Sequence, residues 1–535
     1  MLLSCGRETV APAPNTHATD STPQDGGTMI RRLDADVHSL NPILADSRYD
    51  RYIAFYLFTP MLHLDADLRP VPGLAEKWEV SPDGRDYVFH INPNATFSDR
   101  SPVHASDVLF TLKKIVDPTT EAAQIGAGFE QLDLKRTHVV DDKTIVIAFK
   151  EALAPQLVRF NDLLVLPEHV YGKGDFKNDF NDTAVGAGPY RLVSREAGKQ
   201  IILEKRDDYW FTKPHIQRVI FKIITDDITA WNALKRGEID ETTVGSDTWL
   251  RESSNPLLQK KIDFRRFYTL NYNFIAWNGR SAIFSDKRVR RAMAMCIDLQ
   301  SIIANLFHGT ARAMNGPFTP DQWAYNPDVP VVPFDPAGAR QLLESAGWHD
   351  TNGDGLLDKD GKPLRFDIMI YSGTTSGIPF AQLLQSELKK IGVQMDIAVV
   401  DWTSLSHRVL SGQYQASFMG WDLEADPDPF SLFHSSQFPP RGQNLVFYSN
   451  PEADRLIEEG RRTLDYNQRV EIYHKLHAVI ADDQPYAWTT QVSIKWGVSR
   501  HLRNVKESRG FGLFTWHPGE FNWWIPREER VHDRK

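Results

Sequence analysis

The sequence predicts an α/β protein, and two observations support this fold class. Short apolar or alternating stretches rich in Val, Ile and Phe are interspersed with longer amphipathic stretches along most of the chain. Residues 364–402 also contain a complete strand–helix–strand unit, the usual connection between parallel strands. The 535 residues are enough for roughly three domains of about 150 residues each.

The N-terminal half contains the first predicted elements. Residues 101–118 predict a helix that ends at Asp117-Pro118, because proline cannot continue a helix. A second helix is predicted over 227–240 and ends at Gly237. Four stretches have the length and composition of strands: 86–92, 144–150, 200–206 and 218–224.

The C-terminal half contains the strand–helix–strand unit. Its strands are predicted at 364–373 and 393–402, and they should be parallel because this crossover is almost always right-handed. The helix between them, 380–392, ends at Gly392. Four apolar residues are expected on its buried face: Leu383, Leu384, Leu388 and Ile391. Residues 451–485 predict two further helices in succession.

Composition and motifs exclude several classes of function. The formal net charge of −9 argues against nucleic-acid binding, which needs a basic surface. No apolar run approaches 18 residues, so no transmembrane helix is predicted. No CxxC pair or Cys/His cluster indicates a structural zinc site, and Cys296 lies in an amphipathic run that predicts a buried thiol. The GxSxG, HExxH, GxGxxG and GxxxxGK[ST] motifs are absent, so we expect no enzyme and no required cofactor.

Several stretches occur in one consistent order along the chain: 72–118, 184–210, 219–240, 284–311, 334–348 and 388–402. Together they resemble the extracellular solute-binding proteins of family 5, the periplasmic or lipid-anchored peptide-binding subunits of ABC transporters. The resemblance covers the chain from about Leu33 to Arg500. It implies a binding protein that closes on a peptide or another small solute and then docks on a membrane permease.

The resemblance also implies the fold and the domain boundaries. The expected architecture is a type II periplasmic-binding-protein fold of two lobes, with an extra inserted domain and a ligand cleft between the lobes. Residues 1–27 are expected to be a truncated signal and lipobox followed by a disordered tether. Lobe I is discontinuous and is expected to comprise 28–61, 188–268 and 505–535. The inserted domain is placed at 62–187 and lobe II at 269–504.

The loop within residues 418–438 is expected to bind the ligand. In the oligopeptide-binding relatives the matching Gly-Trp loop supplies an indole wall and a carboxylate for the peptide amine, and Trp421 matches the indole. Asp422 belongs to the same acidic loop. Two assignments of the carboxylate stay open: Glu424 by its distance from Trp421, or Asp426, next to Ala425, by alignment on the proline-containing end. The alternative is that these acids form a solvated face of the loop.

Further candidates flank this loop. Trp402 matches a second pocket tryptophan of the relatives and follows a predicted strand, although it could equally cap the core. Trp277 and Asn278 follow the expected hinge crossing and are candidates for the cleft wall. His434 and the polar residues 435–437 could line the pocket or satisfy one another locally. Phe418 stands where some oligopeptide binders place an arginine, so no carboxylate clamp is available there.

Residues 349–363 match the first part of a calcium-binding EF-hand loop. The matching positions are Asp350, Asn352, Asp354, Asp358 and the carbonyl of Leu356. Gly361 replaces the final glutamate and a strand follows where a helix is required, so an acidic hairpin turn is the alternative. A structural calcium ion here would stiffen lobe II.

The first residues, MLLSC, resemble a lipobox in which Cys5 is the acylated residue. Two or more acyl chains give a stable membrane anchor. The charged and apolar segments that precede a lipobox are missing, so either the true start lies upstream, or this methionine is a truncated or mis-called start and the match arises by chance. The predicted location is therefore the periplasm or the outer face of the cell membrane, and a monomer is expected. A sensory receptor, a carrier of oligosaccharides or metal chelates, and a peptide hydrolase are the alternative functions.

Overall fold

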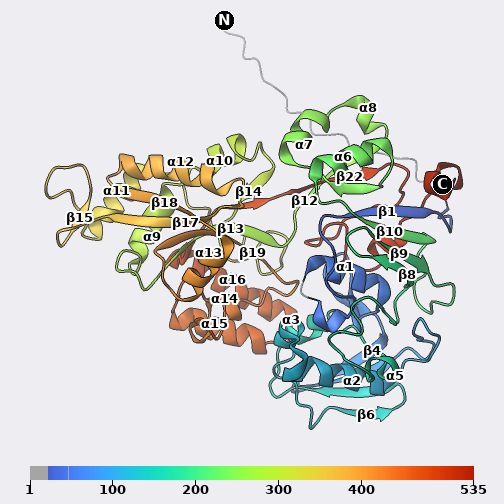
Figure 1. Ribbon diagram of the computed structural model, residues 1–535. Coiled ribbons are helices and arrows are strands. Elements are labelled where there is room, and N and C mark those ends of the chain that lie inside the picture. The colour runs from blue at the N-terminus through green and yellow to red at the C-terminus, as the bar shows by residue number, and fades with distance from the viewer. Residues whose placement is uncertain (1–21, 46, 535) are drawn as a thin grey trace, which may run out of the picture.

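The computed structural model describes residues 22–45 and 47–534, which form two lobes (Figure 1). One lobe contains a seven-stranded sheet and the other a five-stranded sheet, and a four-stranded sheet extends below the first lobe. Cys5 and most of the predicted tether lie outside the described residues. The tether was expected through residue 27, but Asp25 accepts hydrogen bonds from His215 and Lys205, so the folded part begins earlier.

The sheet of lobe I gathers strands from four distant parts of the sequence. β1 (Thr28–Leu33) lies inside this sheet, parallel to both β10 (Arg218–Ile223) and β11 (Glu241–Thr243), and five of its six residues are buried. The strand order is β12 (Ile262–Phe267), β22 (Ile494–Ser499), β11 (Glu241–Thr243), β1 (Thr28–Leu33), β10 (Arg218–Ile223), β9 (Gln200–Lys205) and β8 (Tyr190–Glu196). Its helices are α1 (Arg48–Leu57), α6 (Asp227–Arg236), α7 (Ser246–Glu252) and α8 (Pro256–Gln259).

The inserted unit is an antiparallel sheet covered by short helices. Its strand order is β4 (Ala75–Val80), β5 (Asp86–Ile91), β7 (Thr144–Ala148) and β6 (His138–Asp141). Its helices are α2 (Ala105–Val116), α3 (Ala123–Ala127), α4 (Gln156–Arg159) and α5 (Glu168–Tyr171). A small hairpin of β2 (Leu62–Leu64) and β3 (Pro70–Pro72) leads into this unit.

Lobe II is built on the five-stranded sheet. Its strand order is β18 (Gln394–Val400), β17 (Arg365–Tyr371), β19 (Ala416–Asp422), β13 (Asn271–Trp277) and β20 (Tyr486–Trp488). Two small pairs accompany it: β14 (Ala311–Ala313) with β21 (Thr490–Val492), and β15 (Asp358–Lys359) with β16 (Lys362–Pro363). Its helices are α9 (Lys287–Met295), α10 (Leu299–Asn305), α11 (Pro336–Ser345), α12 (Gly377–Lys390), α13 (Trp402–Leu410), α14 (Phe430–Phe433), α15 (Pro451–Arg462) and α16 (Tyr466–Asp483).

The predicted strand–helix–strand unit of lobe II is confirmed. β17 and β18 are parallel over their whole length, and α12 connects them. Leu384, Leu388 and Ile391 are buried, but the expectation for Leu383 is wrong because its side chain is largely exposed. Leu383 lies about 100° around the helix from Leu384 and so points away from the sheet. The two helices predicted within 451–485 are α15 and α16.

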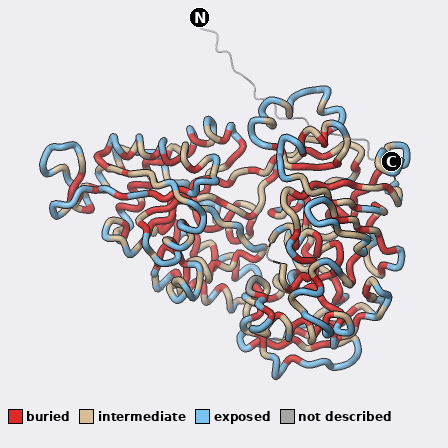
Figure 2. The backbone as a smooth tube through the Cα atoms, in the orientation of Figure 1, coloured by how far each residue is buried: buried red, intermediate tan, exposed pale blue. Residues whose placement is uncertain are grey.

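The hydrophobic cores do not correspond one to one with the sheets. Lobe I and the inserted unit share one continuous hydrophobic core, which includes Tyr56, Phe89, Phe160 and Trp523. Lobe II has two cores, one on each face of its sheet. Figure 2 shows the buried segments running through the interior of each lobe. The inserted unit is therefore fused to lobe I through packing, although its sheet is separate.

One predicted boundary needs correction. Lobe II was expected to continue to residue 504, but β22 already pairs with β11 and β12 of lobe I. The chain therefore returns to lobe I between β21 and β22, because the sheet of lobe I needs this strand between two others. The C-terminal tail, here residues 505–534, then packs on lobe I as expected, with Trp523 and Ile525 in the shared core. No helix among the described residues is long and apolar enough to span a bilayer.

Candidate functional site

The loop that follows β19 reaches from lobe II toward the inserted unit. β19 lies between β17 and β13, and Trp421 is opposite Tyr272 near the end of the strand. The indole of Trp421 stacks on Phe274 and donates a hydrogen bond of 3.2 Å to the hydroxyl of Tyr486. Trp421 is half-buried and is held at the base of the loop by these two rings.

Glu424 connects the two lobes. Its carboxylate lies 3.2 Å from the guanidinium of Arg159 at the end of α4, in the inserted unit. The Glu424 side chain is 67% exposed, so the contact is open to solvent. Its backbone carbonyl accepts a hydrogen bond from Gln322, which fixes the loop on the lobe II side. Of the loop carboxylates proposed from the sequence, Glu424 is the one paired with the other lobe.

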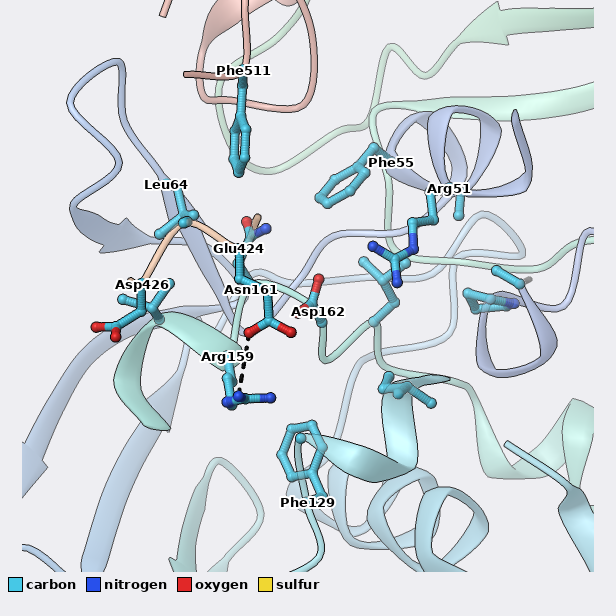
Figure 3. Close-up of a pocket in the computed structure, with 18 residues that line it drawn as sticks. Arg51, Phe55, Leu64, Phe129, Arg159, Asn161, Asp162, Glu424, Asp426 and Phe511 are labelled. Carbon is cyan, nitrogen blue, oxygen red and sulfur yellow. Dashed lines mark ion pairs between the residues drawn. The ribbon is translucent and has the colours of Figure 1, made fainter. Parts of the chain in front are cut away.

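A cavity of about 140 Å³ lies beside this contact (Figure 3). Its walls come from α1 of lobe I, the inserted unit, the lobe II loop and Phe511 of the C-terminal tail. The volume corresponds to roughly five water molecules of the liquid. The labelled lining residues are Arg51, Phe55, Leu64, Phe129, Arg159, Asn161, Asp162, Glu424, Asp426 and Phe511.

The cavity contains charges of both signs. Arg51 and Arg159 contribute guanidinium groups, and Asp162 and Glu424 contribute carboxylates. Partial shielding from water by the surrounding protein raises the pKa of both carboxyls, although both side chains keep exposed surface, and the attraction of Arg159 opposes this rise. The arrangement can therefore offer partners to an ammonium group and to a carboxylate at the same time.

Asp426 also borders the cavity but has a structural role. Both of its carboxylate oxygens accept hydrogen bonds of 2.6 Å from Arg469 of α16, and both side chains are buried. The guanidinium also donates to the carbonyl of Gly460. Because both Asp426 oxygens are engaged within lobe II, Asp426 anchors the loop, and Glu424 is the better candidate for ligand contact. Ala425, which alignment places at this position, also lines the cavity.

The interpretation of Trp277 and Asn278 as cleft residues is wrong. Trp277 is 0% exposed and stacks on Phe284 inside a core of lobe II. The amide of Asn278 is buried and donates to the carbonyls of Gly412 and Tyr414, so it fixes a turn. Trp277 is the last residue of β13, where alternate side chains point into the cores on the two faces of the sheet, and Asn278 begins the turn that follows.

The remaining candidates lie outside the cavity. His434 is buried, accepts a hydrogen bond from the amide of Ser436 and lies 3.3 Å from Glu458 of α15, so it contacts its own turn and this helix. Asp422 is exposed at the end of β19. Trp402 is 58% exposed at the start of α13 and contacts the ring of Tyr371. A ligand contact by Trp402 stays a prediction.

The calcium-like loop forms the hairpin of β15 and β16. Asp350 accepts hydrogen bonds from the amides of Gly353 and Gly355, and Asp354 accepts one from Leu356. Asp358 is bound by Thr351, and Asn352 accepts from Asp354. These contacts agree with the alternative of an acidic turn, and calcium binding stays a prediction.

Sequence patterns missed most of the cavity. Arg51, Arg159 and Asp162 belong to no motif, and they come together only because α1 and the segment after α4 share the core of lobe I.

The prediction for Cys296 is confirmed: the thiol is fully buried, and burial raises its pKa to about 12.

Two α/β lobes with a charged cavity at their contact define the architecture of a solute-binding protein. The family model of bacterial extracellular solute-binding proteins, family 5 (middle region), matches residues 69–444. The chain therefore belongs to this family, and the resemblance noted in the sequence is confirmed. These proteins bind solutes and work with the permease subunits of ABC transporters.

Relatives of known identity cover almost the whole chain. The oligopeptide-binding protein AppA of Bacillus subtilis (strain 168) is 28% identical over 518 residues, which are 94% of this chain and 93% of that protein. The dipeptide-binding protein of Escherichia coli (strain K12) is 26% identical, with 82% of each chain covered. The solved structure of Bacillus subtilis AppA with a nonapeptide has a TM-score of 0.75 at 27% identity and covers 95% of this chain and 100% of that one.

A further solved structure supports the fold. The substrate-binding protein CtaP of Listeria monocytogenes has a TM-score of 0.80 at 23% identity, and 94% of this chain and 100% of that chain are covered. The two-lobed periplasmic-binding-protein fold predicted from the sequence is therefore confirmed.

Proposed function

We propose that this protein captures short peptides between its lobes and delivers them to the permease of an ABC importer. The observation that carries the proposal is the charge pattern of the cavity, with Arg51 and Arg159 facing Asp162 and Glu424. A peptide with free termini carries one ammonium group and one carboxylate, and each finds a partner of opposite charge there. The names of the oligopeptide- and dipeptide-binding relatives support the same ligand class.

Glu424 is the proposed partner of the peptide amine. Its carboxylate pairs with Arg159 across the cleft. A bound ammonium would share Glu424 and leave Arg159 for the peptide carboxylate, so ligand binding would exchange one interlobe contact for two ligand contacts. A ligand favours closure only by the difference in its affinity for the closed and open states. The binding energy would therefore stabilise the closed form that a permease meets.

Trp421 is proposed to form a wall of the peptide site. The indole is fixed against Phe274 and Tyr486 and needs little ordering when a ligand packs on it.

We further propose that the protein acts as a monomer, that it releases its ligand unchanged, and that an acylated Cys5 anchors it at the outer face of the membrane.

The proposal is tested by mass spectrometry of ligands that co-purify with the full-length protein, followed by calorimetry with synthetic peptides. We expect peptides in the native preparation and a loss of affinity of about tenfold or more when the peptide amine is acetylated. E424Q should lose this discrimination, whereas D422N, an exposed acid of the same loop outside the cavity, should keep it. Recovery of a sugar or a metal chelate without peptides would exclude the peptide assignment.

A further inference from the structure

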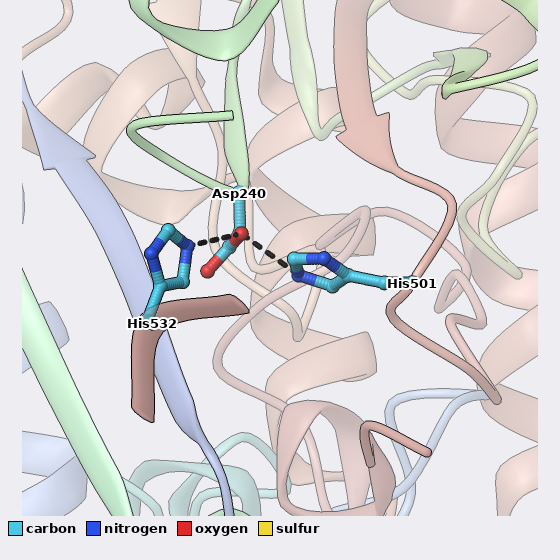
Figure 4. Close-up of side chains that lie close together, drawn as sticks. All are labelled: Asp240, His501 and His532. Carbon is cyan, nitrogen blue, oxygen red and sulfur yellow. Dashed lines mark hydrogen bonds and ion pairs between the residues drawn. The ribbon is translucent and has the colours of Figure 1, made fainter. Parts of the chain in front are cut away.

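Three polar side chains from distant segments meet inside lobe I (Figure 4). Asp240 precedes β11, His501 follows β22, and His532 belongs to the short helical turn η6 (Val531–Arg534) of the C-terminal tail. Their side chains are 0%, 12% and 4% exposed. One potential ligand atom from each residue lies within 4.8 Å of the other two.

The geometry converges on one oxygen atom. Nε2 of His501 lies 2.8 Å from Oδ1 of Asp240, and Nε2 of His532 lies 3.0 Å from the same oxygen. The two imidazole planes are nearly perpendicular, at 84°, so the nitrogens approach from different directions. The other oxygen, Oδ2, accepts a hydrogen bond of 2.6 Å from the amide of Ile30 in β1, which fixes the orientation of the carboxylate.

His501 brings a buried ring nitrogen to this point. Its Nε2 is buried and close to Asp240, yet it lacks the alignment of a hydrogen bond. His532, by contrast, makes a hydrogen bond to the carboxylate. Two imidazole nitrogens and a carboxylate oxygen that converge in one buried space are ligands that a metal ion can use once the imidazoles are neutral.

The charge of the cluster is also suited to a cation. With both imidazoles neutral, the fully buried Asp240 would retain an uncompensated negative charge. A divalent cation would neutralise it directly, among ligands that need only small shifts to admit the ion.

We propose that Asp240, His501 and His532 bind a Zn²⁺ ion that fastens the C-terminal tail to lobe I. Two imidazole nitrogens and one carboxylate oxygen are ligands that zinc prefers, and water would complete a tetrahedral site. Ligand atoms about 2.1 Å from one zinc lie roughly 3.4 Å apart at the tetrahedral angle. The imidazole nitrogens would move outward from the carboxylate by a few tenths of an ångström to admit the ion.

Such an ion would join several segments that the sequence separates widely. It would link the loop before β11, the residue after β22 and the C-terminal tail, and the carboxylate would extend the link to β1. The same tail also holds the start of the described chain, since Arg530 donates hydrogen bonds to the carbonyls of Gln24 and Asp25. The predicted role is structural: zinc would stabilise the closure of lobe I without contact to the charged cavity.

The test uses the full chain, stripped with a chelator and then titrated with Zn²⁺ alone. We expect one equivalent to bind, to raise the melting temperature, and to give a tetrahedral visible spectrum when Co²⁺ replaces it. H501A and H532A should each weaken zinc binding by about 100-fold or more. Substitution of a residue that only supports a metal ligand usually costs about 10- to 100-fold in metal affinity, so the larger loss would identify the two histidines as ligands. Each should also lose the zinc-dependent gain in melting temperature.

H169A is the matched control. His169 also lies against a carboxylate, Asp99 at 2.7 Å, but it is not part of the three-residue cluster. H169A should bind zinc as the parent protein does, and circular dichroism should confirm that each variant is folded. H501Q and H532Q replace any alanine variant that fails to fold. Absence of zinc binding by the folded parent protein, or zinc binding by both histidine variants as tight as that of the parent protein, would overturn the proposal. Peptide affinity should be unaffected, which separates this test from that of the proposed function.

Discussion

Glu424 and Asp426 lie two residues apart on one acidic loop, yet the structure uses their carboxylates in opposite ways. Asp426 is buried and bound through both oxygens by Arg469 of the same lobe. Glu424 is exposed and reaches Arg159 of the opposite lobe. Within one loop, the carboxylate of Asp426 therefore fixes the loop conformation, and that of Glu424 faces the other lobe.

The two ion pairs should also differ in their contribution to the stability of the protein. A buried, bidentate pair costs much desolvation to form, and removal of one partner leaves the other charge uncompensated. An exposed pair is screened by water and contributes little to stability. The Asp426–Arg469 pair should therefore govern folding, and the Glu424–Arg159 pair should govern the opening of the cleft.

The largest expected effect is the loss of the buried anchor. D426N leaves the Arg469 guanidinium buried without its counter-charge, so we expect the free energy of unfolding to fall by about 3–5 kcal/mol. Urea denaturation measures this change. The double variant D426N/R469M should recover part of the stability because no unpaired charge remains. A loss below about 1 kcal/mol for D426N would show that the two pairs are equivalent.

Acid should lower the stability of the folded protein, in part through α16, the helix that holds Asp426. His477 lies on α16 with Arg469, and burial lowers its pKa to about 4; burial also lowers the pKa of His517 in lobe I to about 4. The unfolded chain, with ordinary imidazoles near pH 6.5, binds more protons between pH 6.5 and pH 4. Stability should therefore be complete above about pH 6.5 and fall toward pH 4, by up to about 3 kcal/mol for each histidine.

H477Q isolates the lobe II share of this pH dependence. Nδ1 of His477 accepts a hydrogen bond from the amide of Asn326, which the glutamine carbonyl can accept in its place. Denaturation at pH 7.5 and pH 4.5 should show a smaller difference for H477Q than for the parent protein. An unchanged difference would assign the acid sensitivity to other groups.

Trp421 should affect binding more than folding. W421A removes the proposed wall of the site, and we expect peptide affinity to fall by about tenfold to a hundredfold. Because the indole also packs on Phe274, a loss of stability of about 1–2 kcal/mol should accompany it. W421F keeps an aromatic ring and should retain most of the affinity. Calorimetry that shows equal affinity for W421A and the parent protein would remove Trp421 from the site.

The smallest effect on stability is expected at the exposed pair. E424Q should change the free energy of unfolding by less than about 1 kcal/mol, as is usual for solvent-exposed ion pairs. In the absence of ligand, the variant should instead shift toward more open conformations. Small-angle scattering should then show a larger radius of gyration than for the parent protein. A large destabilisation without opening would reverse the roles of the two acids.

Sequence patterns predicted the helices and strands more successfully than the neighbours against which they pack. The parallel pair β17 and β18 with α12 followed from alternation, helical periodicity and Gly392, all of which are local properties. Leu383 was misplaced because helical spacing defines a face only to within about one residue. The return of β22 to lobe I was placed too late because strand partners are not encoded next to the strand itself.

At the candidate site, too, the sequence identified the loop but not the residues that surround it. The acidic loop after Trp421 was recognisable from its residues, but both Glu424 and Asp426 remained possible ligand contacts. Their assignment depended on Arg469 and Arg159, whose positions relative to the loop are set by packing. Trp277 and Asn278 looked like cleft residues because the sequence gives the strand but not the layer that covers it.

By itself, the sequence determined the α/β class, the family and the loop that carries the candidate site. These rest on patterns within tens of residues, where backbone geometry and hydrophobic periodicity act. Tertiary structure alone decided which acid faces the cleft, which arginines meet it, and that Asp240, His501 and His532 share one point in lobe I. Contacts between such distant residues depend on how whole sheets and helices pack, because packing minimises exposed apolar surface over the entire chain.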